Sequence, residues 1–455
     1  MRTCSISLAS RTLRPRIVAR IFFILAAIGF LAGAVSDAAA ASERKEISAF
    51  DFVQMIGVGV HIRYTDGAYA NVRNVMDDIK FLGIKHVRDD LPGTDNRESL
   101  YARDMMKRMA FDGIKFNLCF PLRWKEFGAI NFLKILEMAV PGSVAFVEGY
   151  NEINNMNSPV EYEGKSGVAG AAAGQKAIYE AIKSDPSLKH IPVIDMTGFV
   201  EMKEQNFAYG ASLKGYADLM NNHAYAQNGQ QPGGWINPEK LGHYKALQDE
   251  MPRTITEFGY SSMPQSGWLL IGVDERTQAK GILNGLFDAA RSSYDKIYFY
   301  ELMDQKADPE SKQLEHHFGL FTFDNRPKIV AHAIRNLTTI LADAGGPAAG
   351  GKAAGQPVPI TVQAADSKEP ILTLGLKKSD GTQFAAIWRE TPFWDRAAGQ
   401  PLEAAPLPAK VSFAGGCKST KLYDVLKSNE PVSTSAGDGF SMNVGDYVQL
   451  VECVR

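Results

Sequence analysis

The sequence predicts a closed barrel of eight parallel strands alternating with helices, a (β/α)8 or TIM barrel of the α/β class, with a small C-terminal antiparallel β-sandwich domain. Between residues 51 and 342, short apolar runs alternate with helix-patterned segments eight times. Most of these runs are apolar at successive positions, as in strands that are covered on both faces. An Ala/Gly/Pro-rich stretch at 344–359 then separates this part from a region of short strands and turns. We therefore expect a barrel at 45–343, a linker at 344–359 and a β-sandwich at 360–455.

The predicted barrel strands are residues 55–60, 84–88, 114–120, 144–148, 191–196, 217–222, 254–256 and 296–300. Helices are predicted at 71–82, 97–111, 170–184, 238–249, 275–290 and 328–342. An open doubly wound sheet is the alternative, but it would normally carry a glycine-rich phosphate loop after its first strand. Gly57 and Gly59 lack a third glycine at the required offset, so a dinucleotide site is not indicated.

Composition excludes several classes of protein. The chain has 455 residues, of which 45% are hydrophobic and 22% charged, with a formal net charge of −2. This composition is typical of a globular protein and excludes a disordered or collagen-like chain. Nucleic acid is not expected as a partner, because binding it requires a basic face. Nothing in the sequence indicates an oligomeric state.

The first 41 residues resemble a signal peptide. Five arginines precede an uncharged apolar run at 21–35, and small residues follow at 38–41. The run is shorter than the roughly 20 residues that a membrane-spanning helix needs. We therefore expect cleavage, a periplasmic or extracellular location and no membrane span afterwards, with an uncleaved anchor as the alternative. In an oxidising compartment Cys417 and Cys453 could form a disulfide, whereas Cys119 lies in an apolar run and is expected to be a buried thiol.

Polar residues follow six of the predicted strands at the edge where active sites of such barrels lie. They are His61, Arg88, Asn151, Glu152, His223, Tyr225, Glu257 and Glu301. A single glutamate after a strand is usually a solvated loop charge. Two glutamates after strands four and seven, Glu152 and Glu257, can face each other across the barrel and flank one bond. Glycoside cleavage requires such a pair of carboxyl groups.

These residues resemble those of the clan A glycoside hydrolases, a large group of retaining (β/α)8 enzymes. That group has an Asn-Glu pair after strand four, matched here by Asn151-Glu152, and a Glu ending strand seven, matched by Glu257. Many members also have His-x-Tyr after strand six, matched by His223-Ala224-Tyr225, and an Arg on strand two, matched by Arg88. The resemblance covers about residues 51–342, and the trailing domain is similar to that of family 39 and its relatives.

The resemblance implies a retaining β-glycosidase that acts on an oligo- or polysaccharide with no cofactor and no metal. Glu152 would be the acid/base, protonated at the start, and Glu257 the ionised nucleophile, held by Tyr225 and Arg88. Asn151 would donate a hydrogen bond to the sugar 2-hydroxyl. The chain departs from many members at two places: Ile153 stands where they have Pro, and Tyr300-Glu301 where they have a sugar-stacking Trp.

The other rim residues have alternative roles. Glu301 could contact sugar hydroxyls or pair with a basic residue of the barrel. His61 and His223 could bind substrate or serve as hydrogen-bonded packing residues. Trp124, Trp235 and Trp268 could stack on sugar rings or anchor loops.

Two other functions are open to a chain of this kind. It could be a catalytically inactive exported protein that binds carbohydrate or assists polysaccharide assembly. A metal-dependent deacetylase would need a His/Asp ligand set that the predicted strands do not supply. The identity of the sugar and endo or exo action are not fixed by the sequence.

Overall fold

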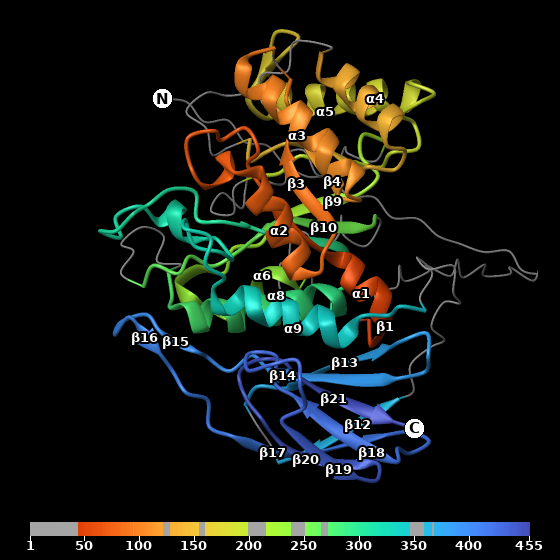
Figure 1. Ribbon diagram of the computed structural model, residues 1–455, viewed down its shortest axis with the longest axis vertical. Helices are drawn as coiled ribbons and strands as arrows, with labels where there is room; N and C mark the ends of the chain where they lie inside the picture. Colours follow the sequence, from red (N-terminus) through yellow and green to blue (C-terminus); the bar gives the residue numbers. More distant parts are fainter. Residues whose placement is uncertain are drawn as a thin grey trace, which may run out of the picture. The chain divides into compact units, whose positions relative to one another are not determined.

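The structure is a computed structural model that describes residues 44–93, 95–121, 128–153, 160–198, 215–237, 251–264, 272–345, 359–365 and 368–455 (Figure 1). The predicted leader, most of the predicted linker, the predicted helix at 238–249, Trp124 and Trp268 lie outside these residues. Within the described ranges, no helix combines the length and apolar character needed to cross a membrane.

The predicted barrel is confirmed. Its eight strands form one parallel sheet, in the order β8-β5-β4-β3-β2-β11-β10-β9. A parallel bridge between Ile194 and Leu219 joins the two outer strands and closes the cylinder. The strands are β2 (Ile56–Gly59), β3 (His86–Asp90), β4 (Lys115–Phe120), β5 (Val144–Tyr150), β8 (Val193–Ile194), β9 (Met220–His223), β10 (Arg253–Phe258) and β11 (Tyr294–Phe299). Each overlaps one of the eight predicted runs.

Helices surround the barrel, and their ends carry local signals. Asn71, Asn96 and Asp274 each accept a hydrogen bond from the backbone three residues on, which caps the helix that follows. The helices are α1 (Ala49–Met55), α2 (Val72–Leu82), α3 (Arg97–Phe111), α4 (Gly128–Ala139), α5 (Gly167–Ser184), α6 (Gly233–Ile236), α8 (Glu275–Arg291) and α9 (Ile329–Leu341). Single 3-10 turns are η1 (Ala68–Ala70), η4 (Gln227–Gly229) and η6 (Leu314–His317). Helices α1, α4 and the short α6 were not among the predicted ones.

The C-terminal part has two antiparallel layers, as predicted. A six-stranded sheet has the order β1-β13-β14-β21-β18-β19, and a three-stranded sheet has the order β12-β17-β20. Ile387, Val411, Phe440 and Val451 belong to the apolar cluster that both sheets share. The strands are β12 (Ile360–Ala364), β13 (Ile371–Lys377), β14 (Gln383–Arg389), β17 (Leu407–Phe413), β18 (Ser419–Tyr423), β19 (Ser433–Ala436), β20 (Gly439–Val444) and β21 (Gln449–Val454). Two short hairpins complete the elements: β6 (Glu161–Tyr162) with β7 (Lys165–Ser166), and β15 (Trp394–Asp395) with β16 (Gln400–Pro401).

One predicted boundary needs correction. We expected the barrel to begin at residue 45, but strand β1 (Glu46–Ser48) pairs in parallel with β13 of the C-terminal sheet. The barrel's own elements therefore begin with α1 at Ala49. The predicted bridge between Cys417 and Cys453 is present, and Cys119 is a buried free thiol, as expected.

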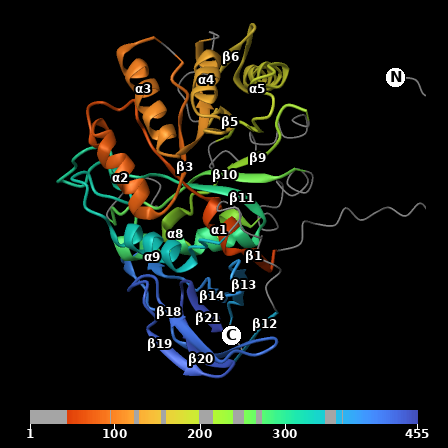
Figure 2. The same cartoon turned by 45° about the vertical axis from the view of Figure 1, so that its right-hand side comes forward.

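The barrel and the C-terminal sheets share a buried interface along α8 and α9, which lie between them in both views (Figures 1 and 2). Lys280 of α8 forms an ion pair with Asp446 at 2.9 Å, and both side chains are almost fully buried. The indole nitrogen of Trp388 donates to Asp288 at 3.2 Å. Breaking a buried ion pair is costly, so these contacts tie the two parts together specifically.

Candidate active site

Glu152 lies directly after β5, in an unusual backbone conformation. Its φ is 41°, in the left-handed region that few residues other than glycine adopt. The backbone N–H of Glu152 donates to the hydroxyl of Thr197 at 3.0 Å, and the N–H of Ile153 donates to the Thr197 carbonyl at 2.9 Å. The segment that follows β8, the next strand of the barrel, therefore holds this turn in place. Strained backbone that neighbours hold in this way is common at functional sites.

Glu257, near the end of β10, is held by two donors. Arg88 Nη1 lies 2.5 Å from Oε1, and the Tyr225 hydroxyl donates to Oε2 at 2.7 Å. Burial acts to raise the pKa of Glu257, but the charges of His223 and Arg88 and the hydrogen bonds from Tyr225 and Arg88 outweigh it. The net effect lowers the pKa, which keeps this carboxyl group ionised.

His223, at the end of β9, joins the two carboxyl groups. Its Nδ1 is 2.9 Å from Glu152 Oε1 and 3.5 Å from Glu257 Oε2. One carboxylate oxygen of each glutamate and the imidazole nitrogen all lie within 4.8 Å of one another. Burial acts to lower the pKa of His223, and the charge of Glu257 and the hydrogen bond with Glu152 raise it above its ordinary value.

The contacts of Nε2, the other ring nitrogen of His223, indicate that this nitrogen carries a hydrogen. Its Nε2 lies 3.1 Å from the hydroxyl oxygen of Thr256. That hydroxyl is 3.1 Å from Glu148 and 2.8 Å from the side-chain oxygen of Asn221, which both accept hydrogen bonds. Since the Thr256 proton goes to one of them, its oxygen accepts from Nε2–H of His223. The second ring nitrogen then shares one proton with Glu152.

A buried network lies beneath the pair. Arg88 donates two hydrogen bonds to Glu148, at 2.9 and 2.8 Å, and a third to Asn151 Oδ1 at 2.7 Å. Asn117 also donates to Glu148, at 2.7 Å. Because the oxygen of Asn151 is occupied by Arg88, its amide nitrogen is the atom that can donate to a ligand. Glu148 was not among the predicted site residues, and its only signal in the sequence is its position as a charge inside the apolar run 144–150.

His61 and Glu301 form a second cluster at strands one and eight. His61 Nε2 lies 3.1 Å from Glu301, whose side chain is fully buried. Tyr69 and Gln305 also donate to Glu301, at 2.9 and 3.0 Å. Burial lowers the pKa of His61, but its contact with Glu301 and nearby aspartates raises it to about 9. The partner of Glu301 is thus a histidine, where we had allowed for an Arg or Lys of the barrel.

The C-terminal domain holds the segment that follows strand six. Gln231 donates to the carbonyls of Thr391 and Asp446, at 2.7 and 3.1 Å. The backbone N–H of Gly233 donates to Glu390, and a side chain at Gly229 would collide with Trp394. This segment begins at His223 and Tyr225, so the C-terminal domain helps to position both. Trp235 Nε1 donates to Gln230 within the same segment, which fits a loop anchor.

A metal ion is chemically conceivable at Glu152, His223 and Glu257, since each offers one ligand atom. One observation opposes it. Both carboxylate oxygens of Glu257 already accept hydrogen bonds, one from Arg88 and one from Tyr225. The arrangement suits proton transfer and nucleophilic attack by carboxyl groups better.

Comparison with known proteins places the fold. No protein-family model and no curated protein sequence matches the chain. Solved structures do match. A glucosidase from Croceicoccus marinus is 12% identical, with a TM-score of 0.57 over 91% of this chain and 99% of that one. A family 39 β-xylosidase from Caulobacter crescentus is 13% identical, with a TM-score of 0.51 over 91% and 98%. A family 51 α-L-arabinofuranosidase from Bifidobacterium longum is 10% identical, with a TM-score of 0.57 over 91% and 97%.

The chain shares its fold with these glycoside hydrolases. The expected likeness to the clan A glycoside hydrolases, family 39 included, is confirmed at the level of the fold. The matches extend over nearly the whole length of each neighbour, so they include the C-terminal domain as well as the barrel. At such low identity they carry no residue roles or substrates.

Proposed function

We propose that the protein is a retaining glycoside hydrolase that cleaves β-glycosidic bonds of an oligo- or polysaccharide. The observation that carries the proposal is the approach of Glu152 and Glu257 to within 4.8 Å across the barrel. Retaining enzymes hold their two carboxyl groups about 5–5.5 Å apart, whereas inverting enzymes need about 6.5–9.5 Å for an intervening water. The separation in this chain supports double displacement.

In the first step, Glu257 attacks the anomeric carbon and forms a glycosyl ester. The bond to the leaving oxygen breaks with its electron pair, and that oxygen takes the proton from Glu152. Because Arg88 and Tyr225 hold Glu257 as a carboxylate, the nucleophile is available near neutral pH. The amide nitrogen of Asn151 would donate to the sugar 2-hydroxyl, a contact that strengthens in the transition state.

In the second step, Glu152 is ionised and removes a proton from water, which attacks the anomeric carbon and releases Glu257. His223 contacts both glutamates. We assign it the role of positioning the carboxyl group of Glu152, which carries a proton before the first step and regains one from water in the second.

Substitution of the two glutamates tests the proposal. Glu257→Ala should lower hydrolysis by on the order of 10⁴-fold or more. Azide should then restore turnover of aryl glycosides to this variant and give a product of inverted configuration. Glu152→Gln should lose about 10²–10⁴-fold on substrates with poor leaving groups. Glu180→Gln, an exposed substitution on α5, is the matched control and should keep full activity.

Full activity in either active-site variant would remove the assignment. Loss of activity on treatment with a chelator would point instead to a metal at the same three groups. Binding to a glycan array without product release at any pH would favour the alternative, an inactive exported carbohydrate-binding or polysaccharide-assembly protein.

We infer that the enzyme acts in the periplasm or outside the cell. The predicted leader at 1–41 and the bridge between Cys417 and Cys453 support this location, because disulfides persist in oxidising compartments. Fractionation of the native host, with the mature N-terminus read by mass spectrometry, tests it. A cytoplasmic full-length chain would contradict the inference.

A further inference from the structure

Four rings run in a row from the proposed nucleophile toward the barrel's edge. Tyr225, which donates to Glu257, has its ring centroid 6.3 Å from that of Tyr300. Tyr300 is 5.7 Å from His61, and His61 stacks on Tyr64 at 4.6 Å with an interplanar angle of 9°. The row connects the ends of three barrel strands: β9, β11 and β2.

The row lies on the side of the site away from Glu152. Tyr300 follows β11, which is four strands from β5 in either direction around the closed sheet, and β5 leads to Glu152. In the proposed reaction the leaving group lies at Glu152, which protonates it, while Glu257 bonds to the sugar that stays behind. The row begins beside Glu257 and leads away from β5. It therefore lies on the side of the site where the glycone is bound.

Tyr64 is the outermost ring and remains open to solvent. Its residue is 41% exposed although one face stacks on His61. His61 is itself held by its contact with Glu301, so it supports the inner face of the Tyr64 ring. Exposed rings held flat by a neighbour are suitable platforms for the apolar face of a sugar.

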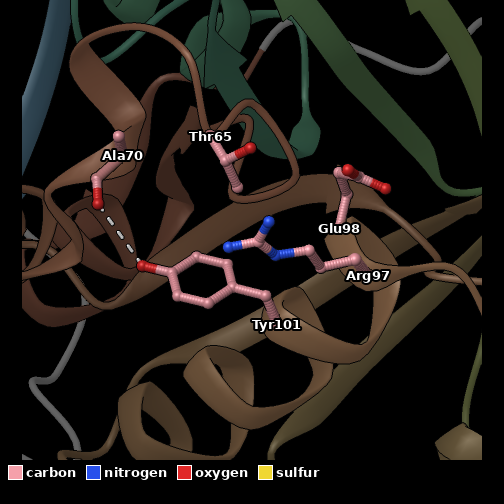
Figure 3. A pocket seen from close by; sticks show the side chains of 5 residues that line it. All are labelled: Thr65, Ala70, Arg97, Glu98 and Tyr101. Carbon is pink, nitrogen blue, oxygen red and sulfur yellow. Dashed lines mark hydrogen bonds between the residues drawn. The ribbon is translucent and has the colours of Figure 1, made fainter.

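A hollow with polar groups in its lining begins at Thr65, the residue that follows Tyr64. It has a volume of about 360 Å³ and is lined by Thr65, Ala70, Arg97, Glu98 and Tyr101, from the loop after strand one and the start of α3 (Figure 3). The Tyr101 hydroxyl donates to the Ala70 carbonyl at 3.3 Å and so joins the two elements. Its hydroxyl, guanidinium and carboxylate groups are the kinds that bind sugar hydroxyls, and its volume lies at the lower end of the range for small-ligand sites.

We propose that Tyr64 and this hollow form an outer saccharide-binding subsite, which takes the second and following sugar units on the glycone side of an oligosaccharide. The direction of the chain, glycone outward, rests on the proposed function. The binding of a saccharide at this place does not.

The test compares short and long ligands in wild type, Tyr64→Ala and Tyr64→Phe. Rates are measured on para-nitrophenyl β-glucoside and β-xyloside and on cello-, laminari- and xylotetraose. Affinities for the three tetraoses are measured by calorimetry, independently of turnover. We expect Tyr64→Ala to weaken tetraose binding about tenfold and to lower kcat/KM on the cleaved tetraose about tenfold more than on the aryl glycoside. Tyr64→Phe, which keeps the ring, should restore most of both.

Two further variants sharpen the result. Arg97→Ala should weaken tetraose binding about threefold, the loss expected for one exposed polar contact. Phe111→Ala removes another exposed ring, 69% exposed at the far end of the same helix α3, and should change neither quantity.

The outcomes separate the two proposals. If wild type binds a tetraose and Tyr64→Ala binds it weakly, the subsite is supported even when nothing is cleaved, and only the proposed function fails. If a tetraose is cleaved but Tyr64→Ala alters its rate and affinity no more than Phe111→Ala does, the subsite is wrong and the enzyme stands. If wild type binds none of the tetraoses, the subsite is overturned.

Discussion

Glu257 and Glu301 end neighbouring strands of one barrel and have closely similar partners. Each is buried, each pairs with a cationic side chain, and each accepts a hydrogen bond from a tyrosine. The difference lies in the kind of cationic side chain. Glu257 pairs with Arg88, which is always charged, whereas Glu301 pairs with His61, which can lose its proton.

The two glutamates also differ in their exposure to solvent and in whether a second carboxyl group lies nearby. Glu257 is 8% exposed and shares His223 with Glu152, while Glu301 is 0% exposed and has no second carboxyl group described on the same imidazole. Burial and a cationic partner are therefore common to both glutamates. In the proposed reaction, Glu257 differs from Glu301 because a second acid, Glu152, contacts the same imidazole.

Arg88→Met should have the largest effect on this comparison. It leaves Glu148 and Glu257 without their cation inside the barrel, and breaking one side of a buried pair costs about 3–5 kcal/mol. Urea unfolding should show a loss of this size. Arg88→Lys, which keeps a charge but not the forked hydrogen bonds, should lie between Met and wild type. A loss below about 1 kcal/mol in the Met variant, the size expected for an exposed pair, would contradict a buried ion-pair network around Arg88.

The His61 pair should respond to pH where the Arg88 pair does not. The pKa of His61 is raised from 6.5 to about 9 in the folded protein, so protonation favours the folded state. The stabilisation is complete below about pH 6.5 and is lost as the pH rises through about 9. Its size is at most about 3 kcal/mol.

Unfolding free energies of wild type and His61→Gln across this range give the measurement. The gap between them should be largest in mild acid and should close in alkali. A gap that is constant with pH would contradict an ion pair with Glu301. The difference in unfolding free energy between His61→Gln and the double variant His61→Gln/Glu301→Gln should change little with pH over this range.

The smallest expected effect comes from the two tyrosines that donate to these glutamates, Tyr225 to Glu257 and Tyr69 to Glu301. Tyr225→Phe removes a donor that lowers the pKa of Glu257, so that pKa should rise and the acidic limb of kcat/KM should move to higher pH. A hydrogen bond to a charged group contributes about 1.5–3 kcal/mol. Tyr69→Phe makes the same change beside Glu301 and should leave the acidic limb in place. Equal shifts in both variants would remove the functional distinction between the two glutamates.

Much of the barrel could be predicted because its signals are local. Strands such as 144–150 and 253–258 are largely apolar, and the polar residues at or just after their ends, such as Glu152 and Glu257, stood out. Glu148 did not, because one charge inside an apolar run carries no information about the arginine that meets it. Its partner Arg88 is sixty residues away in the chain.

Other features depend on contacts that local patterns cannot encode. The left-handed backbone at Glu152 depends on Thr197 from the next strand, and the setting of Glu301 depends on His61 and Tyr69 from the far end of the barrel sequence. The hold of the C-terminal domain on Gln231 and Gly233 likewise joins segments that no spacing rule connects.

The pairing of β1 with β13 has a consequence for how the chain matures. Glu46 is made early, yet its strand partner Gly375 is translated more than three hundred residues later. At ribosomal rates of about 5–20 residues per second, this interval lasts tens of seconds. For that time β1 has no sheet to join, although the barrel strands that follow it can already pair with one another. The edge strand of the C-terminal sheet is therefore synthesised first and incorporated last.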